Sequence, residues 1–255
     1  MGTSSTKVVV LNDKKEAVVL FSQATGWSAV DVADNIGERL RMEGFYPAKC
    51  ACVSTGLGRS AIPFAKRTVE EPVCAALGAV WLYNNPDLLV IDIGARGTRL
   101  INVAGGKMVE IAANNKCAAG TGRFLEMMAS ALALRPSELC RISAEGEAQV
   151  LRSSCAVFAE TEVAQMLASG INKADISRGV VQALVEKVAA QTHSLEQQAE
   201  QACLIGGLCN CPAFCEILSQ RLQQPILVNR QAQYALAIGA AVSAYEESHC
   251  DDSVL

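Results

Sequence analysis

The chain has 255 residues, of which 51% are hydrophobic and 19% are charged, and its formal net charge is -4. A chain of this length and apolar content can bury a large core, either as one large domain or as two smaller ones. The lysines and arginines are scattered rather than gathered in a basic stripe, so we expect no nucleic-acid partner.

The N-terminal segment MGTSSTKVVVL has one lysine and a short apolar run. It fits neither a secretory signal nor a transmembrane span, which needs roughly 20 apolar residues. We therefore expect a soluble, cytoplasmic protein without membrane contact.

Strand-like runs alternate with helical patterns along the chain. Apolar and β-branched runs predict strands at 7–11, 17–22, 50–55, 88–94, 98–104, 108–113, 202–207 and 225–229. Helical periodicity predicts helices at 28–43, 70–84, 118–134, 155–169, 173–198, 211–223 and 233–247. This alternation predicts an α/β protein with mixed sheets.

Two segments, 2–13 and 92–106, share a plan in which a strand is interrupted by glycine and hydroxyl residues and then resumes. Each brings backbone N–H groups and hydroxyls to a turn followed by a basic residue, Lys7 or Arg99, which suits an anion. Either segment alone is better explained as an ordinary hairpin turn. Their recurrence favours two anion-binding loops.

A third glycine pair, Gly206 and Gly207, follows a buried strand and precedes a helix, where N–H groups face a ligand. The P-loop pattern is absent from the sequence, which excludes that class of nucleotide site. The segment STGLGRS (54–60) lacks the spacing of a dinucleotide fingerprint.

The sequence contains 11 cysteines, an odd number, and it is too long and apolar to need disulfides for folding. We expect reduced thiols, some of them metal ligands. The 2 histidines, His193 and His249, lie in polar segments and supply neither a zinc site nor a serine–histidine hydrolase, so we interpret both as surface residues.

Two cysteines, Cys117 and Cys155, each precede a predicted helix, and Ser153 and Ser154 are available as caps for the second. A helix start favours a thiolate, and it favours an anionic cluster bound there. An iron–sulfur cubane needs four thiolates, which a twofold dimer would supply. The alternative is that both are buried, inert cysteines.

The other cysteines fit structural positions better. The group Cys209, Cys211 and Cys215 imitates a metal motif without a familiar spacing. We expect four cysteines to lie in the cores of strands or helices: Cys50, Cys52, Cys74 and Cys203. We expect Cys140 and Cys250 to flank surface segments.

The segments NNKCAAGTGRFLEMMA (114–129) and SSCAVFAETEVAQMLASG (153–170) resemble the two cysteine segments of the ATP-dependent activators of 2-hydroxyacyl-CoA dehydratases. That family includes the ATPase subunits of benzoyl-CoA reductase. The resemblance covers essentially the whole chain, through GTSSTK, STGLGR, VIDIG, LIGG and ALAIGAAVSAY.

The resemblance implies the actin, sugar-kinase and heat-shock-70 fold, with two RNase H-like domains and ATP or ADP with Mg²⁺ in the cleft between them. The first domain would cover 1–86, completed by a C-terminal helix at about 232–255, and the second would cover 87–231 and carry the cluster helices. It implies one 4Fe-4S cluster per homodimer, or per pair of paralogous subunits, ligated by Cys117 and Cys155. The resemblance further implies that the cluster passes an electron only when ATP is bound and hydrolysed. Ferredoxin or flavodoxin would be the electron donor, and an acyl-CoA dehydratase or reductase would be the acceptor.

The resemblance also assigns roles within the nucleotide site. The phosphates would lie on Thr3, Ser4, Ser5, Thr6 and Lys7. Asp92 would hold magnesium or orient water beside Gly94, and Gly206 and Gly207 would let the adenosine approach.

The sequence departs from the family pattern at the nucleotide loops. The Gly-Ile-Asp-x-Gly strand that usually precedes the first loop is absent before Met1, so a misassigned start is one explanation. Ala95, Arg96 and Gly97 stand where relatives carry Gly-Gln-Asp, and Ala75 stands where relatives often carry histidine. Two alternatives therefore stay open beside the iron–sulfur ATPase: a relay or regulatory paralogue that does not hydrolyse ATP, and a small-molecule kinase of the same superfamily.

Overall fold

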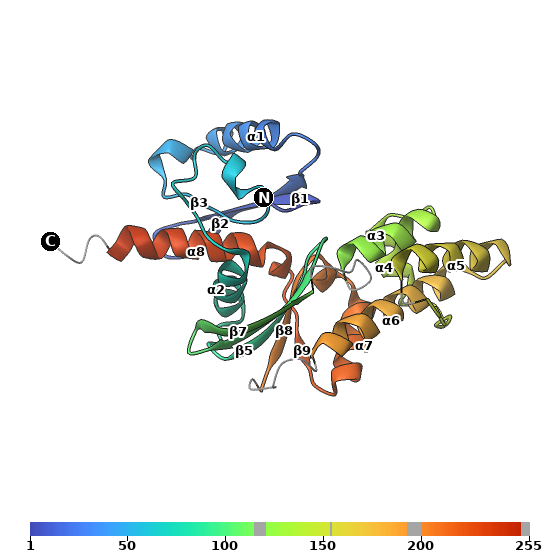
Figure 1. Cartoon of the computed structure of the whole chain (residues 1–255). Coiled ribbons are helices and arrows are strands. Elements are labelled where there is room, and N and C mark those ends of the chain that lie inside the picture. Colours follow the sequence, from blue (N-terminus) through green and yellow to red (C-terminus); the bar gives the residue numbers. More distant parts are fainter. Residues whose placement is uncertain (115–120, 154, 193–199, 251–255) are drawn as a thin grey trace. The chain divides into compact units, whose positions relative to one another are not determined.

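A computed structural model describes residues 1–114, 121–153, 155–192 and 200–250 of the chain, which falls into two units (Figure 1). Unit 1 comprises Met1–Pro86, Gly105–Met108 and Tyr234–Leu255, and unit 2 comprises Asp87–Ala104 and Val109–Gln233. The C-terminal segment thus belongs to the unit that the N-terminus begins. Among the described residues, no helix combines the length and apolarity needed to cross a membrane.

Unit 1 begins with an antiparallel hairpin of β1 (Ser5–Leu11) and β2 (Ala17–Ala24). The Asn12 side chain accepts hydrogen bonds from the N–H groups of Lys14 (3.0 Å) and Glu16 (2.9 Å), which stabilises the connecting turn. Two short strands, β3 (Val53–Ser54) and β4 (Arg67–Thr68), pair in parallel.

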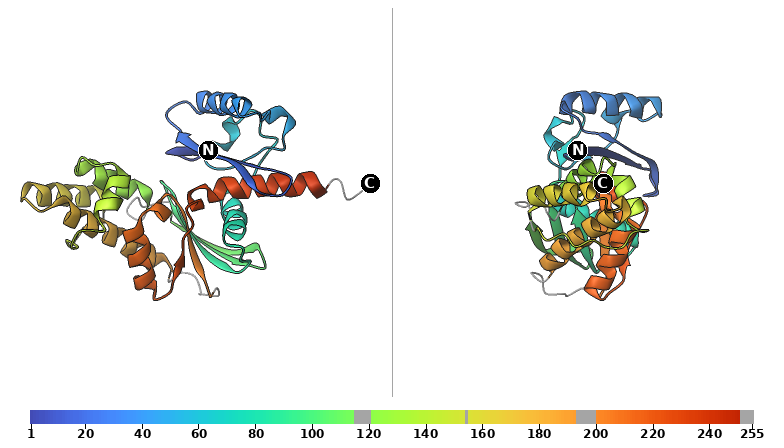
Figure 2. Two further views of the ribbon diagram at one scale, coloured as in Figure 1. Left: turned by 180° about the vertical axis from the view of Figure 1, so that it is seen from behind. Right: turned by 90° about the vertical axis from the view of Figure 1, so that its right-hand side faces the viewer.

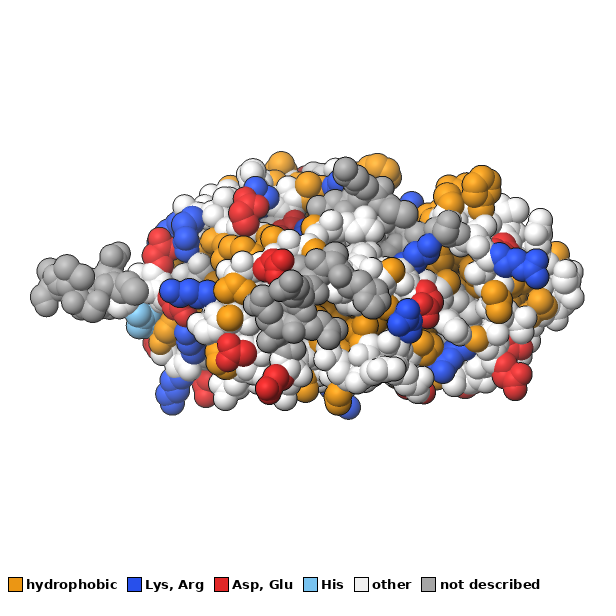
Figure 3. Space-filling model, turned by 60° about the horizontal axis from the view of Figure 1, so that its bottom comes forward, with side chains coloured by type: hydrophobic (Ala, Val, Ile, Leu, Met, Phe, Trp, Pro, Cys, Tyr) orange, Lys and Arg blue, Asp and Glu red, His pale blue; other side chains and the backbone are white. Residues whose placement is uncertain are grey.

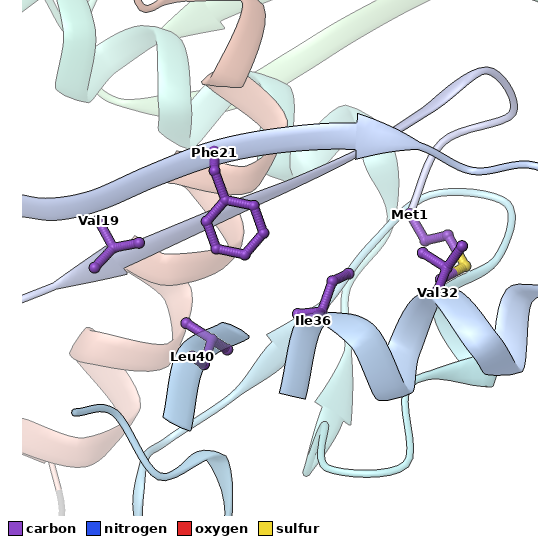
Figure 4. Packing of buried hydrophobic residues seen from close by; sticks show 6 residues of the cluster. All are labelled: Met1, Val19, Phe21, Val32, Ile36 and Leu40. Atoms are coloured by element: carbon purple, nitrogen blue, oxygen red, sulfur yellow. The ribbon is translucent and has the colours of Figure 1, made fainter. Parts of the chain in front are cut away.

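One face of the hairpin packs on α1 (Ala29–Met42), whose N-terminus is capped by Ser28 through the N–H of Asp31 (3.2 Å). Apolar residues three and four apart on α1 point toward β2. Figure 4 shows the resulting cluster, which consists of Met1, Val19, Phe21, Val32, Ile36 and Leu40.

The helices α2 (Glu71–Tyr83) and α8 (Ala235–Cys250) pack closely together within unit 1. A Cβ at Gly78 would collide with the Ala235 carbonyl, and one at Gly239 would collide with the Cys74 carbonyl. The two glycines therefore permit this crossing, and α8 also contacts β1 and β3.

Unit 2 is built on a mixed sheet in the order β7-β6-β5-β8-β9. Its strands are β5 (Leu88–Ile93), β6 (Thr98–Ala104), β7 (Lys107–Asn114), β8 (Ala202–Gly206) and β9 (Ile226–Leu227). Central β5 is buried along its length, antiparallel to β6 and parallel to β8.

Helices cover the sheet of unit 2 and extend beyond it (Figure 2). They are α3 (Gly122–Ala131), α4 (Pro136–Ile142), α5 (Ala156–Ala168), α6 (Lys173–Thr192) and α7 (Pro212–Leu222). The long α6 contacts β6 on one side and α3, α4, α5 and α7 on others, because apolar residues surround most of its circumference. On the face shown in Figure 3, lysine and arginine side chains are interspersed with acidic ones.

The described elements agree with the α/β prediction to within a few residues at most boundaries, and the ends of the predicted helices at 118–120 and 193–198 lie outside the described residues. The prediction missed α4, although Pro136 occupies its first turn and Glu138 accepts the Arg135 N–H (2.9 Å). The predicted strand 50–55 was too long, because β3 covers only Val53–Ser54.

Candidate functional site

The first glycine loop, Gly2 to Lys7, leads into β1 in unit 1. The Gly2 N–H donates to the Ser5 carbonyl (3.1 Å), and the Lys7 ammonium donates to the Ser5 hydroxyl (3.0 Å). Thr3 and Ser4 are exposed, whereas Thr6 is buried. The loop thus gathers hydroxyls, N–H groups and one cation, which is the donor set that phosphate needs.

Thr25, which the sequence analysis missed, holds this loop from the far end of β2. Its hydroxyl donates to the Gly2 carbonyl (2.8 Å) and lies 3.0 Å from the Thr6 hydroxyl, while its N–H donates to the Ser4 carbonyl (3.1 Å). The signal was its position just beyond a strand that pairs with the loop. Thr25 therefore belongs to the scaffold of the first loop.

The second glycine loop connects β5 to β6 in unit 2, and its acidic residue is buried. Asp92 is 2% exposed, and its Oδ2 accepts from Nη1 of Arg99 at 2.8 Å. The two residues are cross-strand partners in the β5–β6 register, so the ladder itself sets their distance. Arg99 thereby compensates the buried carboxylate and fixes its orientation.

The turn of the second loop is joined directly to the start of α3. Gly94 closes the turn by donating to the Gly97 carbonyl (2.9 Å). The first N–H groups of α3, those of Gly122 and Arg123, donate to the carbonyls of Gly94 (2.9 Å) and Ala95 (3.0 Å). These N–H groups have no partner within a helix, so the loop satisfies them and anchors the helix start.

Arg96, at the departure from the family pattern, is exposed on the same turn, whereas Gly97 is buried. Ala75, the other departure, is fully buried in α2. Gly97 therefore offers no carboxylate and Ala75 no imidazole, although the family pattern would place these groups there.

The glycine pair after β8 combines one constrained and one open position. Gly206 has φ +93°, and a Cβ there would collide with the Ile93 carbonyl of neighbouring β5. A Cβ on Gly207 would meet nothing within 4 Å. Gly206 thus allows β8 to pair closely with β5, and Gly207 leaves space beside the backbone for another group.

Cys155 is exposed and is the N-cap residue of α5. The segment before it is held by Glu162 of α5, whose carboxylate accepts from the N–H groups of Arg152 (2.9 and 3.1 Å) and Ser153 (3.1 Å). Glu162 was not predicted from the sequence, where its only signal is an acidic residue seven positions after Cys155.

Cys117 and Ser154 lie outside the described residues, and so does His193. The helix that follows the Cys117 segment, α3, packs against α5. Within the described ranges, no three histidine, cysteine, aspartate or glutamate side chains gather as a metal site. The structure therefore places one of the two proposed cluster ligands, at a helix start and open to solvent.

Several other cysteine assignments need correction. Cys140, expected near the surface, is buried on α4, because that segment forms a helix packed on α6 and α7. Cys50 and Cys52, expected in a strand core, lie before β3 and are half-buried. Cys74 and Cys203 are buried as expected.

His249, which was interpreted as a surface residue, is exposed, and its ring stacks on that of Tyr245 with 4.0 Å between the ring centroids.

The chain is similar to known proteins along nearly its whole length. A model of the BadF/BadG/BcrA/BcrD ATPase family matches residues 1–244. The (R)-2-hydroxyglutaryl-CoA dehydratase activating ATPase of Acidaminococcus fermentans is 32% identical over 251 residues, which are 97% of this chain and 96% of the relative. The crystal structure of that dehydratase's component A from the same organism has a TM-score of 0.91 and covers 98% of this chain and 96% of its own.

A second solved structure is the activator of the 2-hydroxyisocaproyl-CoA dehydratase from Clostridium difficile with bound ADPNP. It is 25% identical, has a TM-score of 0.92 and covers 100% of this chain and 96% of its own. A ROK family glucokinase from Streptomyces griseus, 13% identical with a TM-score of 0.56 over 96% of this chain and 97% of its own, shares the fold alone. The predicted actin, sugar-kinase and heat-shock-70 fold class is confirmed.

Proposed function

Because the chain belongs to the BadF/BadG/BcrA/BcrD ATPase family, we propose that it uses ATP to activate an acyl-CoA dehydratase, or a related acyl-CoA reductase, by electron transfer. The relatives named above as dehydratase activators support the partner class, and the ADPNP-bound structure supports the nucleotide. The observation that carries the proposal is the backbone link from the second glycine loop to α3, the helix that follows the Cys117 segment.

The chemistry of the two loops fits a nucleotide with Mg²⁺. Thr3, Ser4, Ser5, Thr6 and Lys7 would donate to phosphate oxygens. Asp92 would bind magnesium or orient water, since carboxylate oxygen is a preferred ligand of Mg²⁺.

At the second loop, Gly94 keeps the backbone turn tight beside Asp92, and Arg99 holds the carboxylate in place. Gly206 and Gly207 would allow the adenosine to approach the end of β8.

The two cysteines would hold a 4Fe-4S cluster between two copies of the chain, and this group would supply a low-potential electron that ferredoxin or flavodoxin renews. The exposure of Cys155 fits a ligand shared with a second copy, because a buried sulfur could not reach across an interface. Glu162 fixes the backbone before Cys155, and α5 packs on α3.

This arrangement would link a bound nucleotide to the cysteine segments. A change of the second loop on binding or hydrolysis of ATP would pull on the first turn of α3 through the carbonyls of Gly94 and Ala95. Because α3 packs on α5, both cysteine-bearing segments would respond together.

Anaerobic purification tests the cluster. We expect a brown dimer with about four irons per dimer, and Cys117→Ser or Cys155→Ser should each abolish the colour. Cys50→Ser is the control, because Cys50 is half-buried in unit 1 and should leave the colour unchanged. A colourless monomer after anaerobic reconstitution with iron and sulfide would refute the cluster.

ATP turnover on the same sample tests the nucleotide chemistry. Turnover that disappears in Asp92→Asn supports the ATPase, whereas tight ADP binding without turnover supports a relay that does not hydrolyse ATP. Exposed Arg96, in place of the residue that relatives carry, is the observation that favours this second function. Arg96→Gln should then raise turnover.

A further inference from the structure

Thr25, just beyond β2, holds two carbonyls of the first glycine loop in unit 1. Its hydroxyl donates to the Gly2 carbonyl at 2.8 Å, and its N–H donates to the Ser4 carbonyl at 3.1 Å. Gly2 also closes the turn through its own N–H, which donates to the Ser5 carbonyl at 3.1 Å. Thr25 therefore determines how two peptide units of this loop are oriented.

The direction of these two carbonyls determines the direction of the neighbouring N–H groups. The peptide bonds of the loop are trans, so the C=O and N–H groups of each peptide unit point in opposite directions. The Gly2 carbonyl points toward Thr25, and the N–H of Thr3 therefore points away from it. The Ser4 carbonyl likewise turns the N–H of Ser5 away. Backbone N–H groups presented by a turn in this way suit an anion.

The hydroxyl of Thr6 belongs to the same chain of hydrogen bonds. Thr6 is 2% exposed, and its Oγ1 lies 3.0 Å from Oγ1 of Thr25. A hydroxyl carries one proton, and that of Thr25 is directed at a carbonyl, which can only accept. Thr6 is therefore the donor to Thr25, which in turn donates to Gly2. Both hydroxyl protons are used within the loop.

The hydroxyl of Ser5 is directed differently. Ser5 and Thr6 are consecutive in β1, so their side chains lie on opposite faces of the hairpin. Lys7 shares a face with Ser5, and its ammonium donates to Ser5 Oγ at 3.0 Å. Because an ammonium can only donate, Ser5 accepts in this bond and keeps its own proton for another acceptor. Ser5 and Lys7 thus place a hydroxyl donor beside a cation.

We propose that Thr25 is a positioning residue for the phosphates of a bound nucleotide. With Thr6, it holds the loop so that the N–H groups of Thr3 and Ser5 meet phosphate oxygens. The Ser5 hydroxyl, supported by Lys7, donates beside them. This inference rests on the proposed function and narrows its donor set, because the Thr6 hydroxyl acts through Thr25 and does not itself contact phosphate.

Calorimetric titration of the full-length protein with ADP and with adenosine tests this role. Thr25→Val keeps the shape of the side chain but removes its hydroxyl. We expect the affinity for ADP to fall about tenfold, which corresponds to one hydrogen bond to a charged group. The affinity for adenosine, which has no phosphate, should stay the same. Thr25→Ser retains the hydroxyl and should restore the affinity for ADP.

Thr192→Val is the matched control for folding. Thr192 of α6 is 3% exposed, and its hydroxyl donates to the Ala189 carbonyl at 2.7 Å. This variant loses a hydroxyl–carbonyl bond of the same kind, so its melting temperature should fall as that of Thr25→Val does, without a change in ADP affinity. An equal loss of ADP and adenosine affinity in Thr25→Val would mean that Thr25 supports folding alone, which would overturn the proposal.

The two neighbouring hydroxyls provide a second test, which does not depend on the folding of Thr25→Val. Ser5→Ala removes a donor to phosphate and should lower the affinity for ADP about tenfold. Thr6→Val leaves the bond from Thr25 to Gly2 in place and should lower it less than about threefold. An equal or larger loss in Thr6→Val would overturn the assigned proton directions.

Failure of this role is distinguishable from failure of the proposed function. A wild-type protein that binds no ADP would refute the proposed function and this role together. A wild-type protein that binds ADP, with Thr25→Val binding it as tightly, would overturn the role of Thr25 alone.

Discussion

The two glycine loops that precede Lys7 and Arg99 are alike in sequence but are held in opposite ways. In the first loop, Thr3 and Ser4 are exposed and the backbone is held by Thr25, which lies just beyond the neighbouring strand β2. In the second, Asp92 is buried against Arg99, and the turn carries the start of a helix. The first loop is therefore open to solvent on one side, while the second is joined to α3 by backbone hydrogen bonds.

If this contrast is correct, substitutions in the second loop, or in residues that contact it, should strongly lower the free energy of unfolding. Substitutions in the first loop should instead lower the affinity for the ligand. The second loop is continuous with a strand of the sheet at each end, β5 before it and β6 after it. Thr3 and Ser4 of the first loop are exposed residues.

The largest effect is expected for Arg99→Met. It leaves the carboxylate of Asp92, whose side chain is 3% exposed, without its cationic partner, which should reduce the free energy of unfolding by about 3 kcal/mol. Urea denaturation measures this loss. The double variant Asp92→Asn with Arg99→Met removes both charges and should recover most of it; no recovery would mean that Arg99 acts through packing rather than charge.

Gly206→Ala should reduce the stability by about 2 kcal/mol, because φ is +93° and the new Cβ would collide with the Ile93 carbonyl of β5. Gly207→Ala is the matched control, since its Cβ meets nothing within 4 Å and the change should stay within about 0.5 kcal/mol. Equal melting temperatures for the two variants would contradict the close contact between β8 and β5.

Gly122→Ala tests the link between the second loop and α3. Its Cβ would lie 3.3 Å from both Ala95 Cα and the Gly94 oxygen, so we expect a loss of about 1 kcal/mol and faster hydrogen exchange at the Gly94 amide. Gly37→Ala in α1 is the comparison. Its Cβ would meet the Phe64 ring at 3.5 Å, an ordinary contact, and helix propensity should make it stabilising by about 0.5 kcal/mol.

The sequence was sufficient to predict the elements that local hydrophobic patterns and glycine positions determine. The buried runs LLVIDI and ACLIG predicted the central strands, and Cys155 before an apolar run predicted the start of α5. It could not reveal contacts between distant residues, such as Glu162 with the backbone before Cys155, or Thr25 with Gly2. The burial of Cys140 was missed for the same reason, because α4 was not predicted and its packing on α7 depends on residues far away in the sequence.

The smallest effect on stability is expected for Thr3→Ala in the first loop. Thr3 is exposed, so the free energy of unfolding should change by no more than about 0.5 kcal/mol. The affinity for ADP should nevertheless fall about tenfold, since one hydrogen bond to a charged phosphate is worth about 1.5 kcal/mol. Thr161→Ala on α5 removes another exposed hydroxyl and should leave ADP binding unchanged in calorimetry. If Thr3→Ala binds ADP as the wild type does, the phosphate site is not at this loop, and the contrast with the second loop would then concern folding alone.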